Sequence, residues 1–451
     1  MPARRMSGLI TVLGALASFC AAENTGIVSV EGQHFTLAGR PYYFAGTNCY
    51  YLMVFAADPG LRPDVDEVLE DAAALGLTTV RTWAFNDGPS QWNALQLSPG
   101  VYQEYVFQGL DYVLYRADQL GLRVILPLVD NWDDYGGMNE YVAWSPTAAQ
   151  HDEFYTDSAC RQWYKNHVAA VLGRVNTFNG RTYRQDPTVL AWELANEPRQ
   201  QSNSAGNQLQ AWIEEMSAYI KSLDPDHLVT TGSEGFYGPT GPNHNPVSWF
   251  GSMGVDYVRN HSPATIDFCC FHAFPDQWGL SYNASMMWVR NHGTDTDGLL
   301  GKPVIFEEFG KQRPLTTRDT YFQGWYDEIY ASAAAGHSLA GSCFWILYHD
   351  SYTDYDGYGV YWPADASTGQ IISTEAARIK ALNPLAGDLD GAGDIDAADF
   401  ATFTTCLAGP DVTTPPPGCD PMDFAGADLG GDLDVDLADT ALFQRAFGSR
   451  G

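Results

Sequence analysis

Eight short β-rich runs, separated by amphipathic stretches, constrain the fold of this chain more than any other feature of its sequence. The stretches between the runs carry apolar residues at helical spacing, as Leu209, Ile213 and Met216 do. An alternating order of strands and helices predicts a parallel sheet covered by helices, and eight such units favour a (β/α)8 TIM barrel. The expected strands are Tyr42–Thr47, Thr79–Thr82, Val124–Leu128, Val189–Leu194, Leu228–Thr231, Ile266–Phe271, Pro303–Phe306 and Gly341–Trp345.

A doubly wound open sheet is the alternative for this order of elements. Nucleotide-binding sheets of that kind carry a GxGxxG or Walker sequence after the first strand, and neither follows residues 42–47 here. A barrel is therefore favoured. Its chemistry is expected at the C-terminal ends of the strands.

The net charge limits the classes of molecule that the chain is expected to bind. With 55 acidic and 24 basic side chains among 451 residues, the formal net charge is −31. Nucleic acids and anionic membrane surfaces bind through Lys and Arg, so neither is an expected partner. The 13 Trp and 25 Tyr suit stacking on flat neutral ligands, although a bulky core would use them too. We therefore expect a neutral partner.

The N-terminus has the pattern of a secretory signal. Two arginines precede a 14-residue apolar run, Leu9–Ala22, that ends in small residues. A membrane anchor is the alternative, but such a short run does not span ~30 Å of hydrocarbon. A lipid anchor on Cys20 is disfavoured by the bulky Phe19 before it. We predict a signal peptide over residues 1–22 and export of the protein to the extracellular space.

The composition changes near residue 384. Residues 384–451 contain 13 Asp, no Glu and two Arg, and an Asp-rich segment at Asp388 recurs at Asp428. Each repeat spaces its Asp residues like the ligands of an EF-hand loop that leads into a helix. Cys406 and Cys419 flank a Pro-rich loop and are predicted to form a disulfide. We expect two domains, a barrel over residues 23–383 and an Asp-rich module over 384–451.

Paired in this way, the repeats resemble the dockerin modules of extracellular polysaccharide-degrading enzymes. The resemblance implies a small α-helical EF-hand/dockerin-like module, bound Ca²⁺ and a cohesin-like protein partner. A solvated acidic tail is the alternative, although regularly placed apolar residues such as Ile395 and Val435 argue against it. The expected calcium ligands are Asp388, Asp390, Asp396 and Asp399 in the first loop, and Asp428, Asp432, Asp436 and Asp439 in the second.

Carboxylates follow two of the predicted strands. Glu197 comes after the fourth strand in WELANEP, and Glu307 and Glu308 end the seventh in VIFEEFG. Because side chains alternate along a strand, we expect only one of Glu307 and Glu308 to point into a site. Two carboxylates across a sugar are what glycosidic cleavage requires: one protonates the leaving oxygen, and the other attacks or activates water.

Residues 26–383 resemble glycoside hydrolase family 5 endo-β-1,4-mannanases of the subfamily that includes plant and fungal enzymes. Several of the matching segments are long and unusual in composition, which makes chance a poor explanation. They include GTNCYYLM, VRTWAFNDG, LVDNWDDYGGMNEYV, WELANEPR, EGFYG, FHAFPDQW and KPVIFEEFGK.

The resemblance implies a retaining hydrolase of β-mannan-type polysaccharides that needs no cofactor, with Glu197 as acid/base and Glu308 as nucleophile. Glu197 must then start protonated, so its site should raise its pKa, whereas Glu308 must stay ionised with help from Arg81. The other residues expected to bind substrate are Asn131, Trp132, Asn196, Arg199, His272, Trp278 and Trp345.

Two departures from the family pattern concern the site. The family's His-x-Tyr-Pro reads HAFP at residues 272–275, so Phe274 lacks a hydroxyl that normally donates to the nucleophile. Tyr237 or Tyr348 is a candidate substitute. Asp130 stands where the family has Asn, which adds a carboxylate near the cleft.

Three other functions stay open. The chain is alternatively a β-glucan or glucomannan endo-hydrolase of the same family, because the C2 configuration of a sugar is recognised by local hydrogen bonds. A carbohydrate-binding barrel with weak chemistry is a second alternative, motivated by Phe274. A scaffold or adhesion subunit is the third, and it rests on the Asp-rich module alone.

Overall fold

The structure is a computed structural model that describes residue 24 and residues 26–383, 386–390 and 395–447. The predicted signal peptide, residues 1–22, lies outside the described residues, as do residues 391–394 of the first Asp-rich loop. Within the described ranges, no helix is both long and apolar enough to cross a membrane.

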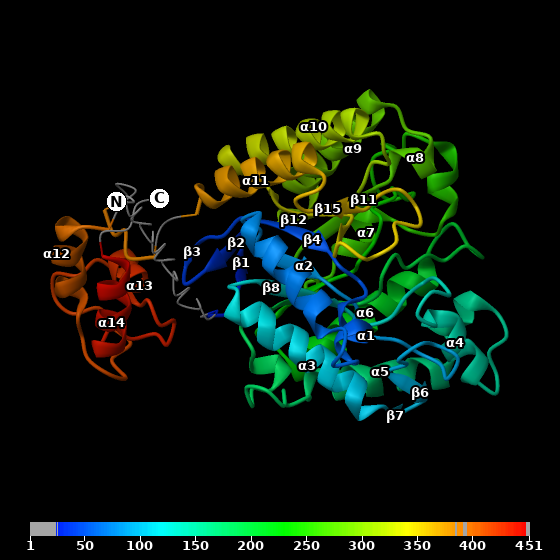
Figure 1. The fold of residues 1–451 in the computed structure, drawn as a ribbon, viewed down its shortest axis with the longest axis horizontal. Helices are drawn as coiled ribbons and strands as arrows, with labels where there is room; N and C mark the ends of the chain where they lie inside the picture. Colours follow the sequence, from blue (N-terminus) through cyan, green and yellow to red (C-terminus); the bar gives the residue numbers. More distant parts are fainter. Residues whose placement is uncertain (1–23, 25, 384–385, 391–394, 448–451) are drawn as a thin grey trace, which may run out of the picture.

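Eight parallel strands form the central sheet, in the order β10-β9-β8-β5-β4-β13-β12-β11 (Figure 1). The two outer strands meet through backbone hydrogen bonds, from Asp267 N to Val229 O at 2.8 Å and from His272 N to Glu234 O at 3.2 Å, which closes the barrel. All eight predicted strands overlap the observed ones, so the (β/α)8 prediction is confirmed. The strands are β4 Phe44–Asn48, β5 Thr79–Arg81, β8 Arg123–Pro127, β9 Val189–Glu193, β10 Leu228–Thr230, β11 Cys269–Ala273, β12 Val304–Phe309 and β13 Leu339–Phe344.

The barrel strands are buried on both of their faces. Every residue of β8 and β9 is buried, as expected for a parallel strand that faces the barrel interior on one side and helices on the other. On the outer layer, Leu209, Ile213 and Met216 of α6 are buried at the predicted helical spacing. Burying one such side chain contributes about 2 kcal/mol, so the apolar stripe holds the helix on the sheet.

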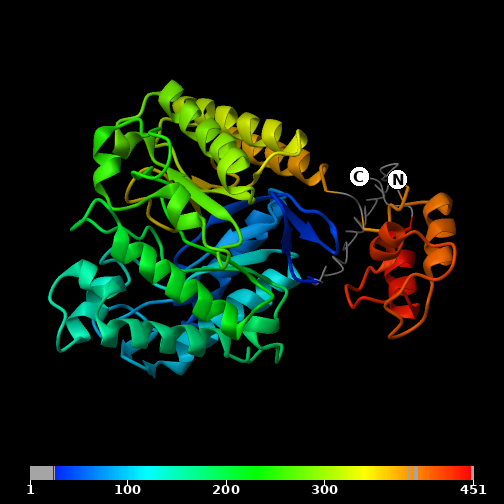
Figure 2. The ribbon, with the colours of Figure 1, turned by 180° about the vertical axis from the view of Figure 1, so that it is seen from behind.

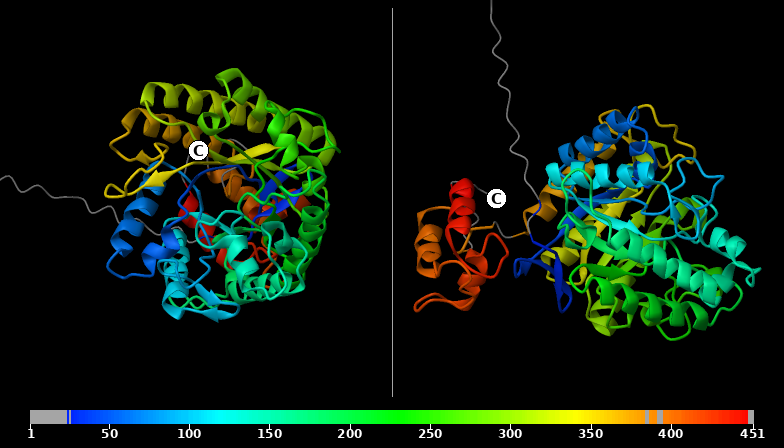
Figure 3. Two further views of the ribbon diagram at one scale, coloured as in Figure 1. Left: turned by 90° about the vertical axis from the view of Figure 1, so that its right-hand side faces the viewer. Right: turned by 90° about the horizontal axis from the view of Figure 1, so that it is seen from below.

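The helices surround the barrel, as two views at right angles show (Figure 3). Asp157 caps one of them, because its carboxylate accepts from the backbone N–H groups of Ala159 and Cys160. The longer helices are α2 Arg62–Ala74, α3 Glu104–Gln119, α5 Ser158–Leu172, α6 Asn207–Leu223, α9 Tyr282–Asp295, α10 Leu315–Ala334 and α11 Ala366–Lys380, and the shorter ones are α1 Leu52–Ala56, α4 Gly137–Trp144, α7 Tyr257–His261 and α8 Pro275–Trp278.

Further short strands form small antiparallel and parallel sheets beside the barrel. The sheet β1–β3 lies at the end of the barrel opposite the strand ends that carry the site, between the barrel and the C-terminal helices (Figure 2). These short strands are β1 Ser29–Glu31, β2 His34–Leu37, β3 Arg40–Pro41, β6 Gln96–Ser98, β7 Val101–Tyr102, β14 Leu347–Tyr348 and β15 Val360–Tyr361.

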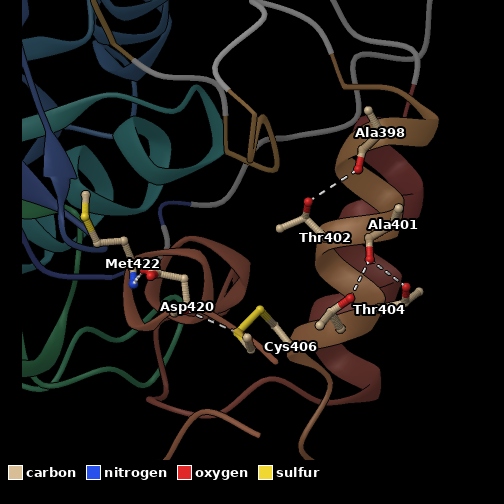
Figure 4. The surroundings of a disulfide bond; sticks show 9 residues. Ala398, Ala401, Thr402, Thr404, Cys406, Asp420 and Met422 are labelled. Carbon is tan, nitrogen blue, oxygen red and sulfur yellow. Dashed lines mark hydrogen bonds between the residues drawn. A yellow bond between two sulfur atoms is a disulfide. The ribbon is translucent and has the colours of Figure 1, made fainter. Parts of the chain in front are cut away.

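The C-terminal residues form a small helical unit with its own core. Its helices are α12 Ala397–Cys406, α13 Pro421–Ala427 and α14 Leu437–Ala446. Cys406 and Cys419 form the predicted disulfide (Figure 4). One contact to the barrel side runs from Arg40 Nη2 of β3 to the carbonyl oxygen of Gly426 at 2.9 Å. The apolar side chains that the unit buries include Ile395, Phe403, Phe424, Val435 and Phe443.

Candidate active site

A cleft of about 580 Å³ opens at the C-terminal ends of the barrel strands, and both predicted carboxylates line it. Glu308 lies within β12 and is 3% exposed, and Glu197 follows β9 and is 8% exposed. Glu197 has a φ of 50°, in the left-handed region that non-glycine residues seldom adopt. Its backbone N–H donates to Gly232 O at 2.8 Å, which holds this strained turn in place and fixes the direction of the side chain.

The two carboxylates face each other closely. One carboxylate oxygen of Glu197, one of Glu308 and a ring nitrogen of His272 all lie within 4.8 Å of one another. Carboxyl groups about 5 Å apart leave room for direct attack on a sugar but not for a water molecule between nucleophile and substrate. The separation therefore suits a retaining mechanism.

Arg81 ties the nucleophile to the barrel interior. Its guanidinium is fully buried at the end of β5 and donates to Oε1 of Glu308. The same group donates to both carboxylate oxygens of Glu193, at 2.7 and 2.6 Å, and to Asn48 Oδ1 at 3.0 Å. A buried carboxylate needs such partners, because removal from water otherwise costs it several kcal/mol.

Asn196 is held at the rim of the cleft from two sides. Its Oδ1 accepts from Arg81 Nη2 at 2.8 Å, and its Nδ2 donates to Asp130 Oδ1 at 3.0 Å. Asp130, the residue that departs from the family pattern, is buried and also accepts from the Trp132 backbone N–H at 3.2 Å. Its carboxyl group thus orients Asn196, as the amide of an Asn would.

Glu197 has a partner on each oxygen. Trp132 Nε1 donates to Oε2 at 2.7 Å, and His272 Nδ1 lies 2.8 Å from Oε1. Burial disfavours the charged form of Glu197, but the hydrogen bond and the positive charge of His272 outweigh burial and lower its pKa. The raised pKa expected from the sequence was therefore wrong for this structure, because His272 and Trp132 both favour the carboxylate.

The pKa of Glu308 moves the other way. Burial raises it, against the attraction of His272 and Arg81, and the negative charge of Glu197 adds to the rise. Two carboxylates at this separation do not both ionise freely, so the pair competes for a proton. A retaining reaction needs that proton on Glu197 when the substrate is bound.

As predicted, only one of the two adjacent glutamates, Glu308, lines the cleft, and Glu307 is buried beneath it. The pairing of β12 with its neighbours shifts register between Phe306 and Phe309, and β11 shifts between Phe271 and His272. Such a bulge turns two successive side chains to the same side. Glu307 is fully buried, with Oε2 3.3 Å from His272 Nε2, beneath the cleft rather than in it.

Aromatic rings form one wall of the cleft. Trp345, predicted to bind substrate, stacks on Tyr50 with ring centroids 5.5 Å apart and planes 16° apart. Trp278, Trp83 and Phe274 line the same cleft. Flat aromatic surfaces of this kind suit the apolar faces of sugar rings.

The hydroxyl missing at Phe274 is not replaced by either tyrosine suggested from the sequence. Tyr237 donates from its hydroxyl to Asp295 Oδ2 at 2.7 Å. Tyr348 stacks on Tyr352, 4.3 Å between centroids, behind the aromatic wall. Neither residue lines the cleft, so among the described residues Arg81 is the donor to the Glu308 carboxylate.

Arg199 lies on the opposite side of the cleft and is fixed by a residue that the sequence analysis missed. Its guanidinium forms two hydrogen bonds with Glu234, at 2.6 and 2.5 Å, and lies 4.8 Å from the centroid of the Trp132 ring. Glu234 follows β10, so its position after a strand was the available clue. Asn131, expected to touch substrate, instead accepts from the Arg199 backbone N–H at 3.2 Å and faces a neighbouring hollow.

The comparisons with known proteins agree with this arrangement. The family described as "GH family 5 beta-mannosidase-like" matches residues 25–353. The chain belongs to glycoside hydrolase family 5. Two relatives carry mannanase names: a putative mannan endo-1,4-beta-mannosidase 5 of Oryza sativa subsp. japonica is 44% identical over 79% of this chain and 77% of that protein, and mannan endo-1,4-beta-mannosidase 5 of Solanum lycopersicum is 42% identical over 80% and 91%.

Solved structures of endo-β-1,4-mannanases have the same fold. The endo-1,4-beta-mannanase of Rhizomucor miehei is 32% identical with a TM-score of 0.70, and the alignment covers 79% of this chain and 99% of that one. The endo-beta-1,4-mannanase of Thermotoga petrophila is 34% identical with a TM-score of 0.68, over 75% and 77%. The family match ends before the C-terminal helical unit begins.

The Asp-rich loops of this family 5 protein gather carboxylates into three groups, of which two share Asp439. In each group, one oxygen per residue lies within 4.8 Å of the others. Asp396, expected as a ligand, lies outside these groups of three and caps α12 by accepting from Ala398 N. Asp436, also expected as a ligand, belongs to one of the groups and caps α14 by accepting from Ala438 N. The groups are Asp388, Asp390 and Asp399 in the first loop, and Asp428, Asp432 and Asp439 together with Asp434, Asp436 and Asp439 in the second.

Proposed function

We propose that this chain is a mannan endo-1,4-β-mannosidase that cleaves internal linkages of mannan, glucomannan or galactomannan with retention of configuration. The observation that carries the proposal is the close approach of Glu197 and Glu308 in an aromatic cleft of a family 5 barrel. The relatives named above bear the same enzyme name. A neutral polysaccharide also suits a chain with a formal charge of −31.

In the first half of the reaction, Glu308 attacks the anomeric carbon while Glu197 gives its proton to the glycosidic oxygen. The bond to the leaving sugar breaks as the ester to Glu308 forms. Arg81 keeps Glu308 oriented through the hydrogen bond to Oε1. Asn196, fixed between Arg81 and Asp130, offers its remaining amide hydrogen to a hydroxyl of the reacting sugar.

In the second half, Glu197 takes a proton from water, which attacks the same carbon and releases Glu308. The roles of Glu197 as acid and then base follow from its two fixed oxygens, one at Trp132 and one at His272. Trp345 supports the ring of the sugar, and Arg199 lies on the side where the leaving sugars extend.

Purified protein tests the proposal directly. We expect release of reducing ends and a fall in viscosity from soluble mannan, with much slower hydrolysis of carboxymethyl cellulose. Glu308→Ala and Glu197→Ala should each lower kcat by at least about 10³-fold. Preference for carboxymethyl cellulose would instead support a β-glucan hydrolase of the same family.

Phe274 supports a second candidate function, a carbohydrate-binding barrel with weak chemistry. The residue lines the cleft and has no hydroxyl to donate to Glu308. Binding of mannooligosaccharides without turnover above the Glu308→Ala background would favour this second function over the first.

We further propose that the protein is exported and that its Asp-rich module attaches it to a cohesin-like partner protein. The pattern of residues 1–22 supports a signal peptide and an extracellular location. The grouped carboxylates suit Ca²⁺, which prefers hard oxygen ligands and would join the two ends of each loop. We expect Asp388, Asp390 and Asp399 to hold one ion, and Asp428, Asp432 and Asp439 a second.

Thermal unfolding with calcium or EDTA tests the module separately from catalysis. Calcium should raise the unfolding temperature of the module in the full chain, and Asp439→Asn should reduce that rise, whereas Asp423→Asn, outside all of these groups, should not. Deleting residues 384–451 should leave hydrolysis of soluble mannan unchanged and abolish binding to a cohesin-like partner. An equal response to calcium in all variants would contradict the calcium sites.

A further inference from the structure

Glu307 is a buried carboxylate that the reaction described above does not use. It precedes the nucleophile on β12, and its side chain is completely shielded from water. Oε2 lies 3.3 Å from His272 Nε2, and the Cys270 thiol lies beside the carboxyl group as a weak donor. Oε1 has no other hydrogen-bond partner among the described residues. A carboxylate kept in such a place costs stability, so a compensating role is expected.

A direct salt bridge with Arg81 is the first role to consider, and the hydrogen-bond geometry excludes it, although the positive charge of Arg81 still acts on Glu307. All five N–H groups of that guanidinium are already used, by Glu193 twice and by three other groups. None of them donates to Glu307. The ring of His272 is therefore the strong donor that Glu307 has within reach.

His272 is held in an orientation in which each of its two ring nitrogens faces a carboxylate. Its backbone carbonyl accepts from Trp288 Nε1 at 2.8 Å, and its backbone N–H donates to Glu234 O at 3.2 Å. With the ring fixed, Nε2 faces Glu307 and Nδ1 faces Oε1 of Glu197 at 2.8 Å. The carboxyl group on one nitrogen sets the tautomer that the other nitrogen presents.

We propose that Glu307 is a positioning residue for the acid/base: its carboxylate accepts the Nε2–H of His272, so that Nδ1 and Glu197 share a single proton. The inference rests on the proposed function, since it concerns the proton that Glu197 delivers. When that proton is on Nδ1, His272 is an imidazolium between two carboxylates. When it moves to Oε1, His272 is neutral and Glu197 is the acid that protonates the leaving oxygen.

The two arrangements contain the same number of protons. One N–H bond of His272 breaks as one O–H bond of Glu197 forms, and Nε2–H stays on Glu307 throughout. The carboxylates around the imidazole raise the pKa of His272 well above its ordinary value against its burial, and the pKa of Glu197 is lowered. The proton is thus retained beside Glu197 at pH values where an isolated Glu would have lost it.

Other charges act on His272 as well, so Glu307 must be distinguished from them by substitution. Two cations lie in the same region, Arg81 and Arg199. The carboxylates that act on the imidazole or on its neighbours are Glu193, Glu197, Glu234, Glu307 and Glu308.

The test is the pH dependence of kcat/KM for mannan in Glu307→Gln. Loss of the negative charge weakens proton binding by the pair of His272 and Glu197, so the alkaline pKa of the profile should fall by about one unit. Glu307→Asp keeps the charge and should restore the alkaline pKa. Glu375→Gln is the matched control, because Glu375 is a buried carboxylate on α11 paired with Arg378, outside the barrel interior.

A substrate whose leaving group needs no proton separates this role from a merely structural one. For a dinitrophenyl β-mannobioside, kcat/KM reports only the first half of the reaction, and Glu307→Gln should change it less than about twofold. For mannan at alkaline pH the same variant should lose about tenfold. Equal losses on both substrates, with an unshifted alkaline pKa, would overturn the proposal.

A measurement on the unchanged protein covers the case in which Glu307→Gln does not fold. Nitrogen NMR of histidine-labelled protein should show Nε2 of His272 protonated from pH 5 to 8, and an unprotonated Nε2 would overturn the proposal. If the unchanged protein hydrolyses neither mannan nor the activated mannobioside, the proposed function fails. If it hydrolyses both and Nε2 is unprotonated or the alkaline pKa does not move, only the role of Glu307 fails.

Discussion

Trp132 donates a hydrogen bond from its indole Nε1 to Oε2 of Glu197 over 2.7 Å. The guanidinium of Arg199 lies over the same indole, 4.8 Å from the ring centroid. Glu197 is therefore tied to the same side of the cleft as Arg199. Because the bond stabilises the ionised form of Glu197, it sets both the direction of that group and its affinity for a proton.

Removing the indole donor should raise the pKa of Glu197. In Trp132→Phe we expect the alkaline limb of kcat/KM to move to higher pH and the rate on mannan to fall about thirtyfold, since a hydrogen bond to a charged group contributes about 2 kcal/mol. Trp249→Phe is the control, because Trp249 lines the cleft without a hydrogen bond to either carboxylate among the described residues. An alkaline limb that stays in place or falls in Trp132→Phe would contradict this role.

Restoring the missing hydroxyl should help the nucleophile. In Phe274→Tyr we expect kcat on mannan to rise up to about tenfold, because a donor at Glu308 stabilises its carboxylate and lowers its pKa. The acid limb of the pH profile should move to lower pH for the same reason. Phe274→Leu, which adds no donor, should bring no gain. An unchanged or higher acid limb in Phe274→Tyr would mean that the new hydroxyl does not reach Glu308.

Asp130 should behave as a neutral group. Burial raises the pKa of its carboxyl group well above the ordinary value, against the hydrogen bonds from Asn196 and Trp132. Asp130→Asn can accept the same two hydrogen bonds, so kcat/KM at pH 6 should change less than about threefold. Asp130→Ala leaves Asn196 without its acceptor and should cost about 2 kcal/mol, or about thirtyfold in rate. A large loss in Asp130→Asn would show that the charge itself is needed.

A buried histidine far from the chemistry should make stability depend on pH. His167 is fully buried against the Ala84 carbonyl, and burial lowers its pKa to about 4. In the unfolded chain the histidine has its ordinary pKa of about 6.5. The free energy of unfolding should therefore fall by about 3 kcal/mol as the pH falls from 6.5 to 4. His167→Gln should reduce that loss in urea unfolding at pH 7 and pH 4.5, whereas the exposed His337→Gln should not. The same loss in both variants would contradict this assignment.

The barrel and the position of its two carboxylates were predictable, because both depend on local patterns. Buried apolar runs mark strands wherever they occur, and residues that follow parallel strands meet at one end of the barrel. The proximity of Glu197 and Glu308 could therefore be predicted without any knowledge of side-chain contacts. The disulfide between Cys406 and Cys419 was predictable for a similar reason, since a short loop joins the two residues.

The contacts and the charge balance inside the site could not be predicted from the sequence. Strand alternation predicted that only one of the two adjacent glutamates enters the cleft, and only Glu308 lines it. It did not predict the register shift in β12 that places Glu307 beside His272. Glu234 was missed because a single Glu after a strand has no motif of its own until Arg199 is seen to pair with it. The pKa direction of Glu197 depends on whether burial or His272 prevails, and only distances decide such a balance.

The central claim is a covalent glycosyl ester on Glu308, and trapping it is the most direct test. The protein should be treated with a 2-deoxy-2-fluoro-mannosyl fluoride, digested and analysed by peptide mass spectrometry. The account predicts a label on the peptide that contains VIFEEFG, with fragmentation placing it on Glu308. A label on Glu307, or fast turnover of mannan to inverted products with no label at all, would contradict it.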